Sequence, residues 1–115
     1  MVDYKDSCVC GKPEDNNCAH YLTNWMILNG NMSANPPGCY CCSSGRPIRA
    51  KEVRDYIFKP KFTEHTTYPG SYCYVYCENR NNGRGHVYYG SKSHCAAGTK
   101  SADQIGYDYN IHYYN

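Results

Sequence analysis

Cysteine and histidine are the residues of this 115-residue chain whose types and spacing suggest chemistry. There are nine cysteines and five histidines. Nine thiols cannot all pair within one monomer, and histidine has no role in a disulfide. Cysteine thiolate and histidine nitrogen are the donors that zinc prefers in four-coordinate sites. We therefore expect bound Zn²⁺ in a structural role, with at least two ions.

The donors occur in two sets of similar order, which indicates an internal duplication. Each half has an opening pair of cysteines, a middle ligand, a tyrosine-bearing strand and a closing pair of donors. We interpret the chain as two related modules, residues 1–58 and 59–115. The predicted metal ligands are Cys8, Cys10, Cys18, His20, Cys39 and Cys41 in the first module, and Cys73, Cys77, His86, His94 and Cys95 in the second.

Strand geometry refines the ligand sets of the first module. Residues two apart on a strand share a face, with Cα atoms roughly 6.5 Å apart. The pairs Cys8/Cys10 and Cys39/Cys41 can therefore each chelate an ion across a slight bend. Cys42 would point to the opposite face, so it is predicted to be the surplus thiol.

The second module is less regular. Cys73 and Cys77 would lie about 13 Å apart on a straight strand, so either they serve different sites or Cys77 lies in the turn. Disulfides remain a competing interpretation of the whole cysteine set. Four bridges with one free thiol, or a mixture of bridges and metal, would also fit the composition.

The elements that must position these donors are predicted to be β-strands. The chain has only two Phe and one Trp, but it has 14 Tyr, and its mean hydropathy is -0.78. Tyrosine favours strands, and a small chain with a thin core needs cross-links. The expected fold is small and all-β, β-rich and irregular, with two metal-stabilised modules, short strands and many turns.

Alternation of apolar and polar residues locates the strands. We predict strands at 21–28, 72–77, 86–89 and 105–113. In the second of these, the tyrosines line one face, and Cys73, Val75 and Cys77 line the other. Asn82-Gly83 predicts a hairpin turn. Residues 49–58 are either a helix, with Val53, Tyr56 and Ile57 on one face, or an irregular connector.

Several classes of function are disfavoured. A net charge of +2 from intermixed residues does not indicate a nucleic-acid partner. No apolar run approaches the ~20 residues of a membrane span. Neither H-E-x-x-H nor H-x-E with C-x-x-C occurs, so we expect no enzyme.

The polar start of the chain is not a signal peptide. It fits either a cytosolic protein or a mature secreted chain, and the cysteine density favours secretion.

With its small size, many cysteines and tyrosines and two-part Cys/His arrangement, the chain resembles secreted effectors of plant-pathogenic fungi. In particular, it is similar to the two-module, zinc-binding avirulence effectors of cereal rust fungi. That resemblance implies structural zinc in both modules and delivery into the host cell cytoplasm. It also implies recognition by a plant immune receptor. We expect a monomer whose partner is a host protein or such a receptor.

Two alternatives stand beside this interpretation. One is a disulfide-rich extracellular toxin, inhibitor or adhesive protein. The other is a catalytically dead ribonuclease-like effector. Tyr40-Cys41, Ser44-Gly45, Tyr68-Pro69 and residues 102–105 resemble landmarks of guanyl-specific fungal ribonucleases. Gly70 stands where that family has its catalytic histidine and Gln104 where it has an arginine, so this likeness implies no ribonuclease activity.

Overall fold

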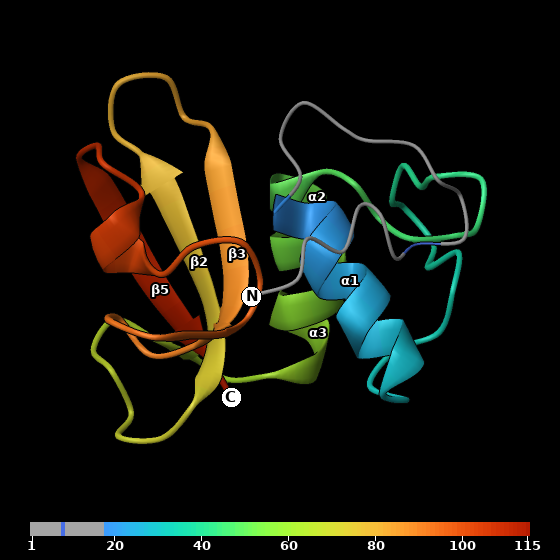
Figure 1. Cartoon of the computed structure of the whole chain (residues 1–115), viewed down its shortest axis with the longest axis horizontal. Helices are drawn as coiled ribbons and strands as arrows, with labels where there is room; N and C mark the ends of the chain where they lie inside the picture. The colour runs from blue at the N-terminus through green and yellow to red at the C-terminus, as the bar shows by residue number, and fades with distance from the viewer. Residues whose placement is uncertain (1–7, 9–17) are drawn as a thin grey trace.

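The computed structural model describes Cys8 and residues 18–115, which form one antiparallel sheet with helices packed against one face (Figure 1). The strands are β1 (Glu64–His65), β2 (Cys73–Asn79), β3 (Gly85–Gly90), β4 (Cys95–Ala97) and β5 (Tyr109–Tyr114), in the order β1-β5-β2-β3-β4. The helical elements are α1 (Cys18–Leu28), α2 (Ala50–Val53), the π-helix η2 (Arg54–Phe58), α3 (Lys59–Lys61) and the 3₁₀ helix η3 (Ala102–Gln104). None of the helices among the described residues is long and apolar enough to cross a bilayer.

The centre of the sheet follows the sequence pattern. β2 pairs with β3 on one side and β5 on the other, so that Tyr76 lies opposite both Val87 and His112. The predicted turn joins β2 to β3, and the Gly83 N–H donates to the Asn79 carbonyl at 2.8 Å. Gly83 has φ +73, which favours glycine. The strand predicted at 105–113 is confirmed only in its second part, since β5 begins at Tyr109.

The two faces of β2 are used as predicted. Tyr74 and Tyr76 join the core between the sheet and the helices. Cys73, Val75 and Cys77 join a second cluster on the other face, together with Ala102 and Tyr113. Strict alternation of side chains along a strand produces this division.

The strand predicted at 21–28 is wrong, because these residues belong to α1. The run is apolar without clear alternation, and a short apolar run cannot be assigned to strand or helix from periodicity alone. Leu22 and Met26, one helical turn apart, are fully buried against the sheet. The Gly30 N–H donates to Ile27 O and the Asn31 N–H to Met26 O. This is the Schellman pattern, and Gly30 at φ +74 ends the helix.

Residues 49–58 were expected to be either a helix or an irregular connector. The structure is helical from Ala50 to Lys61. Val53 and Ile57 are buried as expected, but Tyr56 is 53% exposed and Phe58 takes its place in the core. The π-helical turn explains the change, since its i→i+5 bonding places more residues in one turn than an α-helix does and so shifts which residues face the core.

The expected β-sheet is present, but the all-β class is wrong because α1 and the helical elements from Ala50 to Lys61 pack against the sheet, and two modules are not shown. The main core combines Leu22 and Met26 of α1 with Phe58 of the helical segment and with Tyr76 and Val87 of the sheet. Residues from both predicted modules therefore share one core. The boundary between residues 58 and 59 stays a prediction.

Candidate metal centre

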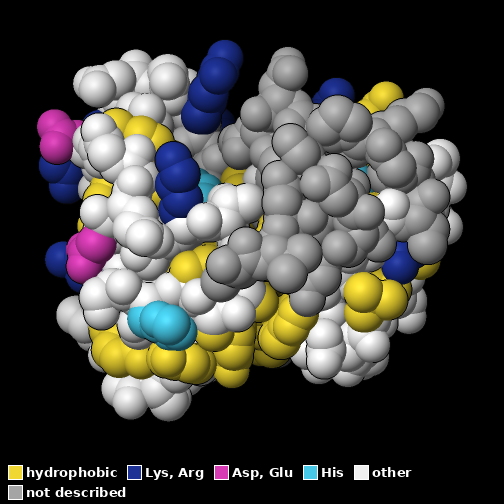
Figure 2. All heavy atoms as spheres, in the orientation of Figure 1, with side chains coloured by type: hydrophobic (Ala, Val, Ile, Leu, Met, Phe, Trp, Pro, Cys, Tyr) yellow, Lys and Arg dark blue, Asp and Glu magenta, His cyan; other side chains and the backbone are white. Residues whose placement is uncertain are grey.

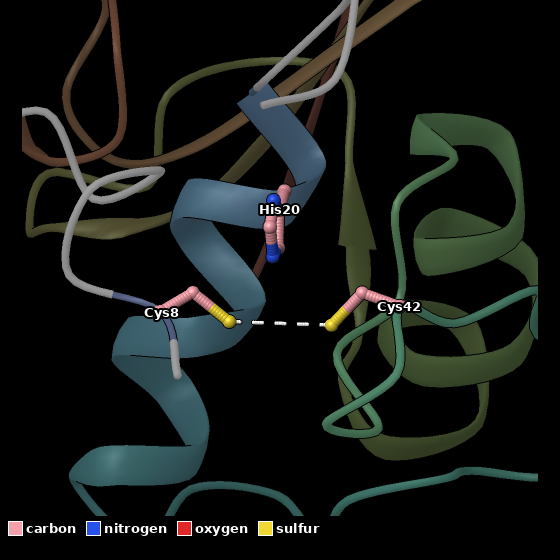
Figure 3. Close-up of side chains that lie close together, drawn as sticks. All are labelled: Cys8, His20 and Cys42. Carbon is pink, nitrogen blue, oxygen red and sulfur yellow. Dashed lines mark hydrogen bonds between the residues drawn. The ribbon is translucent and has the colours of Figure 1, made fainter. Parts of the chain in front are cut away.

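Three of the chain's potential metal donors converge beside the first turn of α1. Cys8, His20 and Cys42 each offer one ligand atom, and these atoms all lie within 4.8 Å of one another. Figure 3 shows the three side chains pointing toward a common space, one from the N-terminal segment, one from α1 and one from the loop before α2. Cys8 and His20 are buried and Cys42 is half-buried.

The loop that carries Cys42 is fixed by its own hydrogen bonds. The Cys42 N–H donates to Arg46 O, and the Gly45 N–H donates to Cys42 O, both at 2.9 Å. An isolated bridge between Cys41 and Pro47 closes the turn. Gly45 has φ +85 and is packed so closely that a Cβ there would lie 2.9 Å from that of Ala34. The tight turn at Ser44-Gly45 thus holds Cys42 in one position.

α1 is attached to the same loop through polar side chains. The Thr23 hydroxyl lies 2.8 Å from the Pro47 carbonyl. The Arg46 Nε donates to Asn24 Oδ1 at 3.0 Å, and its Nη1 donates to Ser44 O at 2.7 Å. Thr23 and Asn24 are fully buried. These contacts set the distance between the helix that carries His20 and the loop that carries Cys42.

The separation of the two sulfurs fits a shared ion better than a disulfide. The Cys8 and Cys42 Sγ atoms are 4.0 Å apart, whereas a disulfide requires about 2.05 Å. Two thiolates at ~2.3 Å from a tetrahedral zinc would be about 3.8 Å apart. All eight cysteines among the described residues are free thiols.

Ser44 is a further member of the group that sequence reasoning missed. Its Oγ lies 3.2 Å from Cys8 Sγ and 3.1 Å from Cys42 Sγ. A hydroxyl in this position can donate a hydrogen bond to a thiolate and so stabilise the charge on the donor set. The spacing Cys42-x-Ser44 in a tight turn is the sequence signal that could have indicated it.

Cys42 itself corrects the ligand assignment, because it was predicted to be surplus. The prediction assumed that residues 39–42 continue as a strand, so that Cys42 would face away from Cys41. The chain instead turns at Cys42, and alternation does not apply in a turn. Cys10 lies outside the described residues.

The remaining first-module cysteines lie elsewhere. Cys18 is buried in the main core, and burial raises its pKa to about 11. Cys39 Sγ lies 3.8 Å from the carbonyl of Glu52, and Cys41 Sγ lies 3.5 Å from the carbonyl of Cys39. Burial raises the pKa of Cys39 to about 11, with a smaller contribution from Cys41 and Glu52.

The predicted ligands of the second module do not converge. Cys73, Cys77 and Cys95 are buried on the far face of the sheet, where burial raises the pKa of Cys77 to about 12. The His86 Nε2 lies 2.7 Å from Lys100 O, and the His94 ring stacks on Tyr72 at 5.7 Å. In the part of the chain that the structure describes, the group at Cys8 has no counterpart in this half.

Comparisons of the chain with protein-family models, with curated proteins and with solved structures found no match.

Proposed function

We propose that Cys8, His20 and Cys42 hold a structural Zn²⁺ ion, and that the protein acts by binding another protein rather than by catalysis. The convergence of two thiols and one imidazole from three separate segments carries the metal proposal. Sulfur and imidazole donors together suit zinc better than magnesium or calcium.

A structural role follows from what the ion would connect. Cys8, His20 and Cys42 come from three stretches of the chain that are far apart in sequence. An ion bound to all three would cross-link the N-terminal segment, α1 and the loop before α2. Small domains with few core residues commonly gain stability in this way.

The sequence led us to expect at least two zinc ions, whereas the group of Cys8, His20 and Cys42 would hold one. A second ion would need further donors, and in the C-terminal half β2 carries Cys73 and Cys77 at opposite ends of a five-residue span. One ion per chain is the stoichiometry that the described donor set supports.

The biological setting is proposed on the resemblance alone. We propose a secreted fungal effector that enters host cells and binds a host protein or plant immune receptor, with nucleic acid and membranes excluded as partners. The exposed tyrosines, among them Tyr40, Tyr56 and Tyr72, support a protein-binding role, because tyrosine is enriched at protein interfaces.

Native mass spectrometry of the protein, purified without a reducing agent, tests the metal proposal. We expect a mass increment of one zinc ion that disappears with a strong chelator, and a loss of helical circular dichroism on chelation. A mass that is lower by the protons of several disulfides and insensitive to chelator would contradict it. Expression in leaves of a panel of host plants, scored for receptor-dependent cell death, tests the effector proposal separately.

A further inference from the structure

An aromatic groove lies away from the metal centre, between the end of α1 and the sheet. A row of four rings forms it, and consecutive ring centroids are 5.3, 4.9 and 5.0 Å apart from Trp25 through Tyr89 and Tyr74 to Phe62. The groove encloses about 530 Å³, a volume typical of ligand sites. In Figure 2, hydrophobic side chains form a band along the lower left of the molecule, below the strands of the sheet in Figure 1, and the inner end of this band comes near the position of α3.

The groove is lined mainly by aromatic rings, and two of these residues carry hydrogen-bond donors. Tyr74 is buried, whereas Trp25 and Tyr89 are half-buried. Among the described residues, none accepts a hydrogen bond from the Trp25 indole N–H or the Tyr89 hydroxyl. An occupant that offers carbonyl oxygens would satisfy both donors.

The groove carries one formal charge. Lys61 lines it, its ammonium donating to Asn31 O at 2.8 Å, and no carboxylate is among the lining residues that the structure describes. A cationic occupant would be repelled by Lys61. Single-stranded nucleic acid needs a track of positive charge along its backbone, and one lysine does not provide it.

We propose that this groove binds a proline-rich segment of another protein in the polyproline II conformation, with an acidic residue beside the prolines to pair with Lys61. Polyproline II has no internal hydrogen bonds, so its carbonyls are free to accept from Trp25 and Tyr89. Five residues at ~3.1 Å each cover about 15 Å, which matches the row of rings. Recognition of proline-rich segments by aromatic grooves is a recurring mode of peptide binding. The inference deepens the proposed protein-binding function and rests on it, but not on the metal.

The test uses the intrinsic fluorescence of Trp25, since the chain has one tryptophan. The probe is a blocked peptide of five prolines with an aspartate at each end, added to the zinc-loaded protein. We expect a saturable change in Trp25 emission. Replacing the prolines by glycines should weaken binding about tenfold, because the flexible chain must then be ordered on binding.

Two variants assign the binding to the groove. Tyr89→Phe keeps the ring that stacks on Trp25 but removes the donor, and should weaken binding roughly 3–10-fold. Lys61→Glu should weaken binding of the aspartate peptide and leave a peptide with asparagine ends nearly unaffected. Tyr56→Phe and Lys92→Glu, at exposed positions outside the groove, are the matched controls and should bind like the wild type.

No saturable change at millimolar peptide, in protein that is folded by circular dichroism, would overturn the proposal. So would wild-type affinity in both groove variants, or preferential binding of a single-stranded oligonucleotide or an oligosaccharide. Failure of the proposed zinc site would appear differently, as a chain that carries no metal in mass spectrometry.

Discussion

The sulfur atoms of Cys8 and Cys42 lie 4.0 Å apart although 34 positions separate the two residues in the chain. Folding has to bring the N-terminal segment, α1 and the loop before α2 together to produce this approach, because His20 of α1 lies within 4.8 Å of both sulfurs. An ion at this point would stabilise the folded state against the unfolded chain, in which the three donors are far apart.

Cys42→Ser should therefore abolish zinc binding and destabilise the protein. With free zinc about 1,000-fold above the Kd, loss of the site would remove ~4 kcal/mol and lower the Tm by roughly 15 °C. Cys39→Ser is the matched control, since this nearby thiol is also half-buried but lies outside the group. Equal melting temperatures for the wild type and Cys42→Ser in zinc-containing buffer would contradict a stabilising ion.

Ser44→Ala tests the role of the hydroxyl that lies 3.1–3.2 Å from both sulfurs. Loss of a hydrogen bond to the donor set should weaken zinc affinity about 10-fold or more while leaving the stoichiometry unchanged. Competition with a zinc-sensitive dye measures the affinity. Ser43→Ala, one residue away and exposed, should bind zinc like the wild type.

The buried thiols of the sheet predict a loss of stability at alkaline pH. Burial raises the pKa of Cys77 to about 12 and that of Cys73 to about 11, from an ordinary value near 9. Above pH 9 the unfolded chain loses these protons while the folded chain keeps them. Stability is therefore fully present below pH 9 and falls as pH rises toward 11–12, by about 1.4 kcal/mol per pH unit for each thiol.

Urea unfolding at several pH values between 8 and 11 measures this slope. Cys77→Ala should be less stable at every pH, because it leaves a cavity, but its stability should fall less steeply with pH. An identical slope in the variant would show that Cys77 is not a buried free thiol.

Tyr88 connects β3 to the segment that covers the far face of the sheet. Its hydroxyl donates to Ser91 O at 2.6 Å and accepts from the Ala102 N–H at 3.0 Å. Tyr88→Phe leaves both buried groups without this partner, and should cost about 2–4 kcal/mol in the free energy of unfolding. Tyr40→Phe, at a position 56% exposed, should change stability by less than about 0.5 kcal/mol.

The shared core predicts one cooperative unfolding transition. Leu22 of α1 and Val87 of β3 belong to the same cluster, so the regions 1–58 and 59–115 should lose structure together. Thermal melts followed by Trp25 fluorescence and by far-ultraviolet circular dichroism should coincide. Two separated transitions would instead support independent modules.

The central strands and their faces could be predicted from the sequence because the alternation in β2 and β5 directly reflects burial on two different faces. α1 could not, since all of residues 18–24 are buried, including the polar Thr23 and Asn24, so polarity along this run does not follow exposure and gives no clear period. The exposure of Tyr56 could not be predicted, because it depends on a π-helical turn that changes which residues lie on the buried face. Such a turn has no reliable sequence signal.

The sequence predicted the types of donor in the candidate site, but it did not predict which residues come together there. Cys8 and His20 were among the predicted ligands, and the donor types indicated zinc. Cys42 was missed because strand alternation was applied to a residue that lies in a turn. Which of eleven predicted ligands meet in space depends on tertiary packing, for example the Thr23 and Arg46 contacts that seat the loop on α1.

X-ray absorption at the zinc edge of the metal-loaded protein tests the central claim most directly. The arrangement of Cys8, His20 and Cys42 predicts one zinc per chain with at least two sulfur neighbours at ~2.3 Å and one imidazole nitrogen at ~2.0 Å. Cys42→Ser should lose this signal, and Cys39→Ser should keep it. A chain without zinc, or a zinc shell that lacks either sulfur or imidazole, would contradict the proposed centre.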